Sequence, residues 1–549
     1  MNRVSWCRRA RRKIPLALPA AFCVMMAVPC KKVAAQSSDG RSDTPWFWQW
    51  TPLRSIGTLG TPSPSAPFSP HALDVPAPSI GLGWSGANPA GLADDLDRAW
   101  TAWTAGARGL GGSYRAPVDP SSASALSASL AGWRPVSENH RVIGRVRVEQ
   151  STIAAGDQAV FIDANPASPF TPTDTNAPAF SRTRVTLEGG DAVRLGSWRM
   201  GVTLGYDGVS DHAVQSRAAV TRRATSAGAG LGVARSFGDA AVVGLSWRRV
   251  LHTETVDLFA DPGTVRIFPL DGYVSVAPDD HSIADAPFYR RVDHTGDAYG
   301  LDVSGTLRGT RWTAYAHGEE SGETQVVTAG SGTPYTRWNT TGGVVGAAAQ
   351  RVLGAIAATA AADLEVQRGT AIRQAESATS YTADASRLAF NGDLRWSSAS
   401  RDVSAAAQIG LERQYQRASD RTARASTDIT AWTPSGGVEV VWDATSARSW
   451  SAGFTTSRFV PFADLPSPTA RGPAYVNLIA PALEMAAAPA TSNTVSVGVR
   501  WHRLSSTVVA RLSWSEISVA QRAVDATTLP AGMRSVWSAM LTVTPGVLK

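Results

Sequence analysis

The sequence predicts an all-β fold, an antiparallel transmembrane outer-membrane β-barrel of about 18 strands, with 16 strands as the alternative. Three observations predict this fold. Apolar and polar residues alternate along many segments, short and long connections succeed one another, and tryptophans lie beside the short connections. We therefore expect short periplasmic turns at one end of the barrel and long extracellular loops at the other.

Residues 1–35 have the composition of a cleaved secretory signal peptide. A basic stretch ends at Lys13, and the apolar stretch that follows it to Pro29 is too short to span a bilayer. Small residues ending in Ala34-Ala35 offer a cleavage site, while a lipoprotein signal ending at Cys30 is the alternative. Beyond this segment no run of about 18 apolar residues occurs, so we expect no transmembrane helix.

The formal net charge of +7 does not describe the exported chain. Eight basic residues lie in residues 1–35, which hold no acid, so the remainder carries a formal charge of −1. All three cysteines, Cys7, Cys23 and Cys30, also lie in this segment. The exported chain therefore has no electrostatic basis for binding nucleic acid, and it is expected to contain no disulfide, cysteine-ligated zinc or thiol nucleophile.

Residues 36–96 are expected to form an irregular periplasmic leader or a small plug, because proline, serine and threonine are frequent there. The candidate plug residues are Asn88, Pro89, Gly91 and Leu92. Glycines between Gly81 and Gly86 match a dinucleotide-binding fingerprint by letter, but no hydrophobic strand precedes them. We therefore expect no cofactor, and we assign the barrel to residues 97–549.

Alternation with a period of two predicts strands that have one apolar and one polar face. In residues 198–207 the apolar face is Trp198, Met200, Val202, Leu204 and Tyr206, and the other face is Arg199, Gly201, Thr203, Gly205 and Asp207. Residues 403–412, 495–502 and 508–515 alternate in the same way. One apolar face is what a strand between lipid and a polar interior requires.

The succession of connections favours a membrane barrel over a soluble sandwich, whose strands also alternate. Short turn-like links are expected near residues 135–140, 194–197, 237–240, 308–311, 352–355, 397–401, 443–448 and 502–506. Long polar links are expected near residues 109–123, 151–180, 208–225, 252–297, 319–341, 367–383, 417–435, 459–492 and 519–532. This succession implies about 18 strands, and an even number returns both termini to the periplasm.

Tryptophans beside the short links predict an aromatic girdle at one rim of the barrel, because an amphipathic indole prefers the bilayer interface. The girdle residues are Trp133, Trp198, Trp312, Trp396, Trp442, Trp450 and Trp501.

Two groups of charged residues share strand faces and are expected to line the lumen as polar ladders, with a structural rather than a catalytic role. The first is Arg145, Arg147 and Glu149, and the second is Arg182, Arg184 and Glu188. Arginine suits this lining because its planar guanidinium can pair with carboxylates across strands. The glycines of residues 228–232 lie within a strand, where glycine usually marks tight packing or curvature.

With these patterns the chain resembles an uncharacterised outer-membrane β-barrel family, known mainly as a domain of unknown function. The resemblance is carried by Ser85 to Leu92, by the strand start at Gly112-Ser113-Tyr114, and by strand pairs ending near Arg249. Residues 88–92 are also similar to the N-terminal motif of long-chain fatty-acid transport barrels. The family implies a location, the cell outer membrane, rather than an activity.

The resemblance also implies two partners, outer-membrane lipid and the barrel-assembly machinery. Outer-membrane barrels commonly end in an aromatic residue that this machinery recognises, whereas this sequence ends in Leu548-Lys549. A small solute is a further expected partner.

The longest expected loop, residues 252–297, holds acids and histidines of the types that bind divalent cations or act as acid and base. They are Asp279, Asp280, His281, Asp293 and His294. Such loop clusters are usually solvated, so we assign neither a metal site nor a catalytic residue. No Gly-x-Ser-x-Gly, His-Glu-x-x-His or phosphate-loop pattern occurs in the sequence.

Together these features predict a non-enzymatic outer-membrane barrel that serves as a channel or as an accessory or structural component of solute uptake. The motif at residues 88–92 motivates a narrower version, transport of a hydrophobic solute. The alternatives are a surface-exposed outer-membrane hydrolase and a soluble secreted β-protein. After the loop cluster, His317 with Glu319 and Glu320 is the next candidate for catalytic chemistry.

Overall fold

The computed structural model describes most of the chain from Asn88 onward. The described residues are 88–93, 99–113, 122–154, 170–174, 179–214, 219–238, 241–259, 267–271, 274–275, 288–328, 335–373, 379–398, 402–445, 447–465, 480, 483–484, 487–503, 506–519 and 532–545. All of them belong to one compact unit, Ser38–Gly546. The expected signal peptide, and the expected leader up to residue 87, lie outside the described residues.

The described part is almost entirely strand, preceded by one short 3-10 turn, η1 (Pro89–Ala93). The strands are β1 (Trp100–Gly112), β2 (Ser122–Ser137), β3 (His140–Ile153), β4 (Phe170–Asp174), β5 (Ala179–Leu195), β6 (Trp198–Val214), β7 (Ala219–Phe237), β8 (Ala241–Phe259), β9 (Ile267–Asp271), β10 (Val274–Ser275), β11 (Phe288–Leu307), β12 (Thr310–Thr328), β13 (Tyr335–Leu353), β14 (Ile356–Arg373), β15 (Thr379–Ser397), β16 (Val403–Asp420), β17 (Ala425–Thr445), β18 (Arg448–Asp464), β19 (Ala490–Arg503), β20 (Ser506–Val519) and β21 (Gly532–Pro545).

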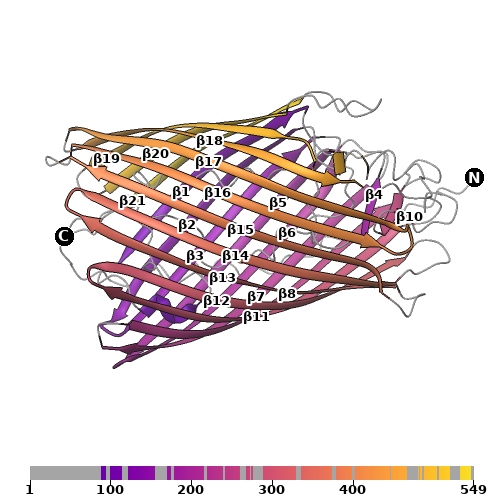
Figure 1. The fold of residues 1–549 in the computed structure, drawn as a ribbon, viewed down its shortest axis with the longest axis horizontal. Helices are drawn as coiled ribbons and strands as arrows, with labels where there is room; N and C mark the ends of the chain where they lie inside the picture. Colours follow the sequence, from indigo (N-terminus) through magenta and orange to yellow (C-terminus); the bar gives the residue numbers. More distant parts are fainter. Residues whose placement is uncertain are drawn as a thin grey trace, which may run out of the picture. The chain divides into compact units, whose positions relative to one another are not determined.

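Eighteen of the described strands form one closed antiparallel sheet, which confirms the predicted fold class and strand number (Figure 1). Each strand pairs with the next in chain order once β4, β9 and β10 are left out, and β21 pairs with β1 to close the ring. At this closing pair Trp103 lies opposite Val543. Closure leaves no strand of the barrel with an unpaired edge. Strands β4, β9 and β10 form a small separate sheet.

Short and long connections alternate around the barrel as the sequence predicts. At one end, called here the short-turn end, two to five residues join successive strands. Arg308 and Gly309 form one of these turns with φ angles of 50° and 77°, a left-handed pair that lets a two-residue loop match the twist of a hairpin. The other end, called the long-loop end, carries the connections that include β4, β9 and β10.

Four of the expected long links are mostly strand, which corrects their predicted lengths. The links near 208–225, 319–341, 367–383 and 417–435 shrink to residues 215–218, 329–334, 374–378 and 421–424. Asp293 and His294, expected in the longest loop, likewise lie in β11. Toward the long-loop end the outward face of the strands becomes polar, as at Ser210 and His212 of β6. The strands therefore extend beyond the segment in which apolar and polar residues alternate.

The pleat of each strand separates an outward apolar face from an inward polar face. In β6 the side chains of Trp198, Met200, Val202, Leu204 and Tyr206 are exposed, whereas Arg199, Thr203 and Asp207 are buried. The same alternation recurs in the paired strands, since residues on one face align across the sheet. The barrel therefore has an apolar outer band and a polar interior.

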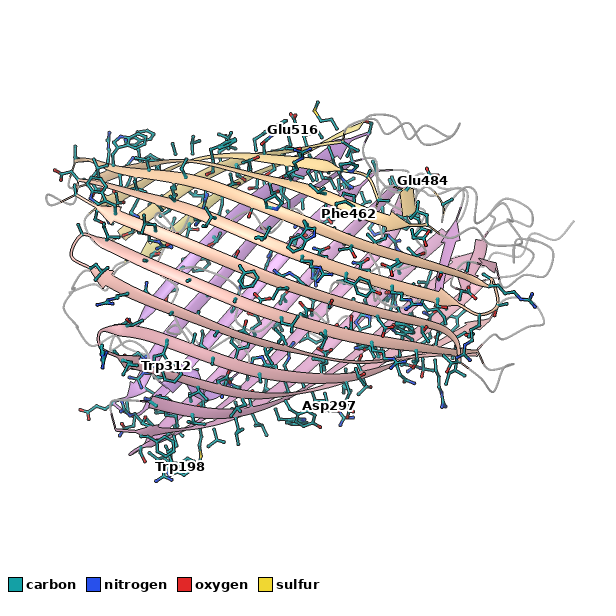
Figure 2. The ribbon with its side chains drawn as sticks, in the orientation of Figure 1. Trp198, Asp297, Trp312, Phe462, Glu484 and Glu516 are labelled. Atoms are coloured by element: carbon teal, nitrogen blue, oxygen red, sulfur yellow. The ribbon has the colours of Figure 1, made fainter. Side chains whose placement is uncertain are left out.

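A row of tryptophans marks the outer band at the short-turn end. Trp198, Trp312, Trp396, Trp442, Trp450 and Trp501 hold outward positions there, and Figure 2 labels Trp198 and Trp312. Trp103 of β1 joins them, although the sequence analysis did not select it. Trp133 differs, because its backbone pairs with that of Ile143, a buried inward residue.

A second aromatic row, which the sequence analysis missed, marks the opposite edge of the band. Its members are Tyr206, Trp247, Tyr299, Trp432, Trp514 and Trp537. Polar partners lie beside it. The indole N–H of Trp247 donates to Asp297 Oδ1 over 3.2 Å, and the Arg413 guanidinium lies 5.7 Å from the Trp432 ring centre. Figure 2 shows Asp297 on the outside of the barrel.

A closed barrel with an apolar band between two aromatic rows is a transmembrane barrel of the outer-membrane type. Closure satisfies the backbone hydrogen bonds, and the outward face suits the hydrocarbon core of a bilayer. In the portion of the chain that the structure describes, no helix is long and apolar enough to cross a membrane.

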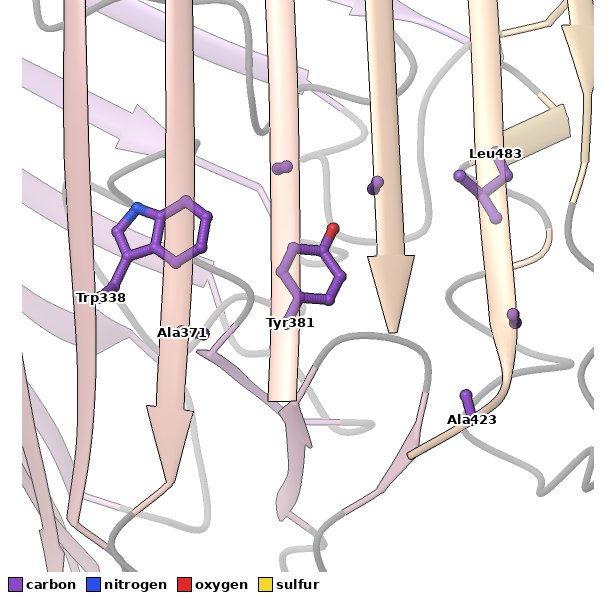
Figure 3. Packing of buried hydrophobic residues seen from close by; sticks show 8 residues of the cluster. Trp338, Ala371, Tyr381, Ala423 and Leu483 are labelled. Atoms are coloured by element: carbon purple, nitrogen blue, oxygen red, sulfur yellow. The ribbon is translucent and has the colours of Figure 1, made fainter. Parts of the chain in front are cut away.

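At the long-loop end an apolar cluster packs against the inward faces of β13–β17 (Figure 3). Trp338 and Tyr381 are its aromatic members, with ring centres 6.1 Å apart. Leu483, from the connection between β18 and β19, is 1 % exposed within this cluster. Part of a long connection thus packs against residues on the inside of the barrel.

Candidate functional site

The first expected polar ladder lies on the inward face of β3 and is bound to its neighbours by ion pairs. Arg147 donates to Glu149 over 2.7 Å, and Arg108 of β1 donates to the same carboxylate over 2.6 Å. Arg145 Nη1 lies 3.9 Å from Glu188 Oε2 on β5. The register places β3 and β5 side by side, so residues distant in sequence become neighbours.

The second ladder, on β5, pairs with acids of β6. Arg184 binds Asp207 through two of its nitrogens, with distances of 2.8 Å. Arg182 binds Asp211 in the same two-point manner over 2.9 Å. Arg222 of β7 donates to the same Asp211 carboxylate over 2.8 Å. The Asp211 carboxylate therefore lies between two guanidiniums.

These pairs continue into a group of charges buried toward the long-loop end. Asp211 and Arg222 are both 0 % exposed, and the Arg222 guanidinium lies 3.6 Å from the centre of the Phe180 ring. Arg290 of β11 donates to Glu254 of β8 over 3.1 Å, again with both side chains buried. The strand patterns could place these residues on the inward face, but the pairing itself follows only from the register.

The wall formed by β14, β15 and β16 carries a second cluster of charged residues, which is centred on Arg387 of β15. Its guanidinium lies 2.9 Å from Asp363, 3.9 Å from Glu365 and 2.9 Å from Glu412. These acids come from β14 and β16, the two neighbours of β15. Three carboxylates thus surround one guanidinium, which leaves this wall with an excess of negative charge.

Hydroxyl side chains pair across another part of the wall. Ser513 and Ser538 lie 2.7 Å apart, Thr494 and Ser515 lie 2.8 Å apart, and Thr104 and Thr542 lie 3.1 Å apart. Strands β19, β20, β21 and β1 contribute these residues. The interior is therefore polar on several sides.

The expected plug residues lie inside the barrel, against the inward faces of β6 and β7. Asn88, Pro89 and Gly91 are buried, and the side chain of Leu92 lies outside the description. A Cβ atom on Gly201 would clash with the carbonyl oxygen of Pro89, and one on Gly232 would clash with Asn88 Oδ1. These two glycines thus form a notch in the wall that receives the segment.

Hydrogen bonds hold the segment in this notch. Asn88 Oδ1 accepts from the backbone N–H of Ala90 over 3.0 Å, which closes a local turn. Asn88 Nδ2 donates to Asp302 Oδ2 on β11 over 3.3 Å. The other oxygen of this carboxylate lies 3.1 Å from His317 Nε2. His317, a candidate for catalysis in the sequence, is thus buried beside the residue that anchors Asn88.

Of the five candidate metal ligands, two lie in the described part of the chain. Asp279, Asp280 and His281 lie outside the described residues. Asp293 and His294 are consecutive in β11, so their side chains point to opposite faces of the sheet. Asp293 is bound to Arg291 outside the barrel, whereas His294 is paired with His252 in register on the inside. Within the described residues no group of three or more such side chains could hold a metal ion.

The chain matches the Family of unknown function (DUF6850) over residues 89–543. This match confirms the resemblance to an uncharacterised outer-membrane barrel family. It also extends well beyond Arg249, where the resemblance noted in the sequence ends. No curated protein matches the chain.

Several solved outer-membrane proteins resemble the chain at low identity. The ferric preacinetobactin receptor of Acinetobacter baumannii is 8 % identical over 81 % of this chain and 80 % of its own, with a TM-score of 0.36. A FadL homologue of Pseudomonas aeruginosa is 10 % identical over 86 % and 96 %, with a TM-score of 0.33. The toluene transporter TodX of Pseudomonas putida is 12 % identical over 86 % and 98 %, with a TM-score of 0.30.

Proposed function

The chain belongs to the family of unknown function DUF6850, and since that description supplies no activity, we propose one from the interior of the barrel. We propose that the protein is an outer-membrane channel for a small polar solute. In this proposal residues 88–91 act as a plug at the inner wall. The proposal assigns no catalytic residue, and its partners are outer-membrane lipid, the assembly machinery and the solute.

The observation that carries this proposal is the fit between the N-terminal segment and the barrel wall. Gly201 and Gly232 leave room for residues 88–90 where any side chain would obstruct them. Gly232 lies opposite Gly201 in the register of β6 and β7, so the two gaps adjoin. A barrel with a wall shaped around one of its own segments has a means of narrowing its passage.

The chemistry of the interior favours a polar solute over the hydrophobic solute that the Asn-Pro-Ala-Gly-Leu motif suggested. Ion pairs line β3, β5 and β6, carboxylates surround Arg387, and hydroxyls line β19–β21. An apolar molecule moving along these surfaces would displace water from charged groups without replacing its hydrogen bonds. Barrels of 16–18 strands are wide enough to leave an aqueous channel.

Planar-bilayer conductance of the full-length protein tests the proposal. Gly232→Leu fills the notch and is expected to displace the plug, so its conductance should exceed that of the wild type. Gly296→Ala is the control, since a Cβ there meets only ordinary van der Waals contacts, the nearest with Ser321 Cβ at 3.4 Å. It should conduct like the wild type.

Two results would contradict the proposal in different ways. Equal conductance of the wild type, Gly232→Leu and a variant lacking residues 88–93 would show that the segment is no plug. Absence of conductance in all of them, with the barrel correctly inserted, would exclude passage of a solute.

A further inference from the structure

We infer that the interior separates charge across its width and that the solute is a zwitterion, an inference that rests on the proposed passage of a solute. One wall presents guanidiniums to the interior, and the opposite wall presents an excess of carboxylates. A small molecule that carries both a positive and a negative group can satisfy both walls by turning as it passes.

The positive wall is formed by β3 and β5, and its polarity comes from unequal exposure within ion pairs. Arg147 is 36 % exposed while its partner Glu149 is 8 % exposed. Arg184 is 43 % exposed while Asp207 is 4 % exposed. The carboxylates are covered and the guanidiniums face the interior, so this wall offers positive charge although each pair is formally neutral.

The negative wall is formed by β14, β15 and β16. Its charge is negative because carboxylates outnumber guanidiniums in the cluster that these strands carry. Around Arg387, which is 33 % exposed, Asp363, Glu365 and Glu412 are 18–19 % exposed. All four groups are partly accessible, and three carboxylates outnumber one guanidinium. The cluster therefore carries a net negative charge of two when its members are ionised.

The order of strands places these walls opposite one another. Around the closed sheet of 18 strands, β15 is nine strands from β3 in either direction, and β16 is nine strands from β5. Their charged residues also lie at comparable depths. Arg147 is seven residues from the short-turn end of β3, and Glu412 is nine residues from the same end of β16.

Opposed walls of this kind create an electric field across the passage. A zwitterion gains from orienting its ammonium toward the carboxylates and its carboxylate toward the guanidiniums, whereas a neutral solute of equal size gains nothing. A singly charged ion is attracted by one wall and repelled by the other. The field therefore selects for a dipolar solute rather than for one sign of charge.

Liposome swelling with two tripeptides of similar size tests the inference. Triglycine is a zwitterion, and acetylated, amidated triglycine is neutral. We expect triglycine to enter proteoliposomes about five- to tenfold faster than the neutral peptide. Equal rates for the two peptides on the unmodified protein would overturn the inference, and this comparison needs no variant.

Charge variants identify the walls. Glu365→Gln with Glu412→Gln should abolish the preference and shift the reversal potential in a KCl gradient toward anion selectivity. Arg147→Gln with Arg184→Gln should shift it toward cation selectivity. Arg291→Gln, on the outside of the barrel, is the control and should change neither property.

The failure of this inference can be told apart from failure of the proposed channel. Two results would contradict this inference alone. One is a conducting protein with no preference for the zwitterion, and the other is a shift of the reversal potential in the wrong direction in the variants. The absence of conductance and of swelling, with or without the plug, would contradict both the proposed channel and the inferred preference for a zwitterion.

Discussion

Replacing Asp211 with alanine should destabilise the barrel strongly, because this buried carboxylate is the shared partner of two guanidiniums, one of which, that of Arg222, is fully buried. Arg182 reaches it through two hydrogen bonds of 2.9 Å, and Arg222 reaches it through bonds of 3.1 and 2.8 Å. Asp211 and Arg222 have no solvent exposure. The substitution therefore removes the carboxylate that both guanidiniums share.

The magnitude follows from the cost of an uncompensated buried charge. Removing one partner of a buried ion pair typically costs about 3–5 kcal/mol, because the remaining charge loses both its Coulombic partner and its hydrogen bonds. Arg182 is partly exposed and can be hydrated, while Arg222 cannot. We therefore expect Asp211→Ala to lower the free energy of unfolding by about 3–5 kcal/mol.

Reversible urea unfolding in lipid vesicles, followed by tryptophan fluorescence, measures this change. The matched control is Asp293→Ala, which breaks the Arg291–Asp293 pair outside the barrel, where the two side chains are 51 % and 43 % exposed. Exposed pairs contribute about 0–1 kcal/mol, so the control should unfold almost like the wild type. A loss below about 1 kcal/mol for Asp211→Ala would refute the reasoning, since it would mean that the guanidiniums are hydrated.

Three further predictions concern the outer band and the long-loop end. Val202→Arg places a charge in the middle of the apolar band of β6 and should cost about 2–4 kcal/mol in the same unfolding assay, whereas Ser210→Arg, beyond the band, should cost about 0–1 kcal/mol. Leu483→Ala should lower the free energy of unfolding by about 2–5 kcal/mol, because Leu483 is fully packed against the Trp338 cluster; a wild-type unfolding curve would show that the connection does not pack there. Arg413→Ala removes the contact with the Trp432 ring and should cost about 0.5–1 kcal/mol, with Arg413→Lys retaining part of it.

The sequence predicts the faces of the strands well, because one residue of register error would move every side chain to the wrong side of the sheet. In β6 the alternation of Met200, Val202 and Leu204 with Gly201 and Thr203 determines which residues meet lipid. The turn at Gly309, whose φ is 77°, lies within the short link expected near residues 308–311. Eighteen strands follow from the number of such segments and the links between them.

The ends of the strands could not be predicted from the same signal. Beyond the apolar band both faces of a strand are polar, as at Ser210 and His212, so the alternation disappears while backbone pairing continues. The alternation also fails to show which residues face inward beside a shift in the register of strand pairing. Trp133 precedes a register shift between Pro135 and Ser137, and it pairs with an inward residue although its neighbourhood resembles that of the girdle.

The contacts of the candidate site depend on distant pairings and were only partly predictable. The alternation indicates that Arg182 faces inward, but its partner Asp211 is 29 residues away and becomes its neighbour through the register of β5 and β6. The glycines at 230 and 232 suggested close packing, and the structure supplies the occupant, residues 88–90. No local pattern connects these two segments, which are more than a hundred residues apart.

Site-directed spin labelling along β6 tests the central claim, that a closed sheet places alternate residues in lipid and in a polar interior. Because all the cysteines lie in residues 1–35, their replacement by serine leaves a background for single cysteines at positions 199–207. In vesicles, collisions with oxygen should be most frequent at residues 200, 202, 204 and 206, and collisions with a water-soluble nickel chelate should be most frequent at residues 203, 205 and 207. Equal access of the nickel chelate to both sets would contradict the membrane barrel.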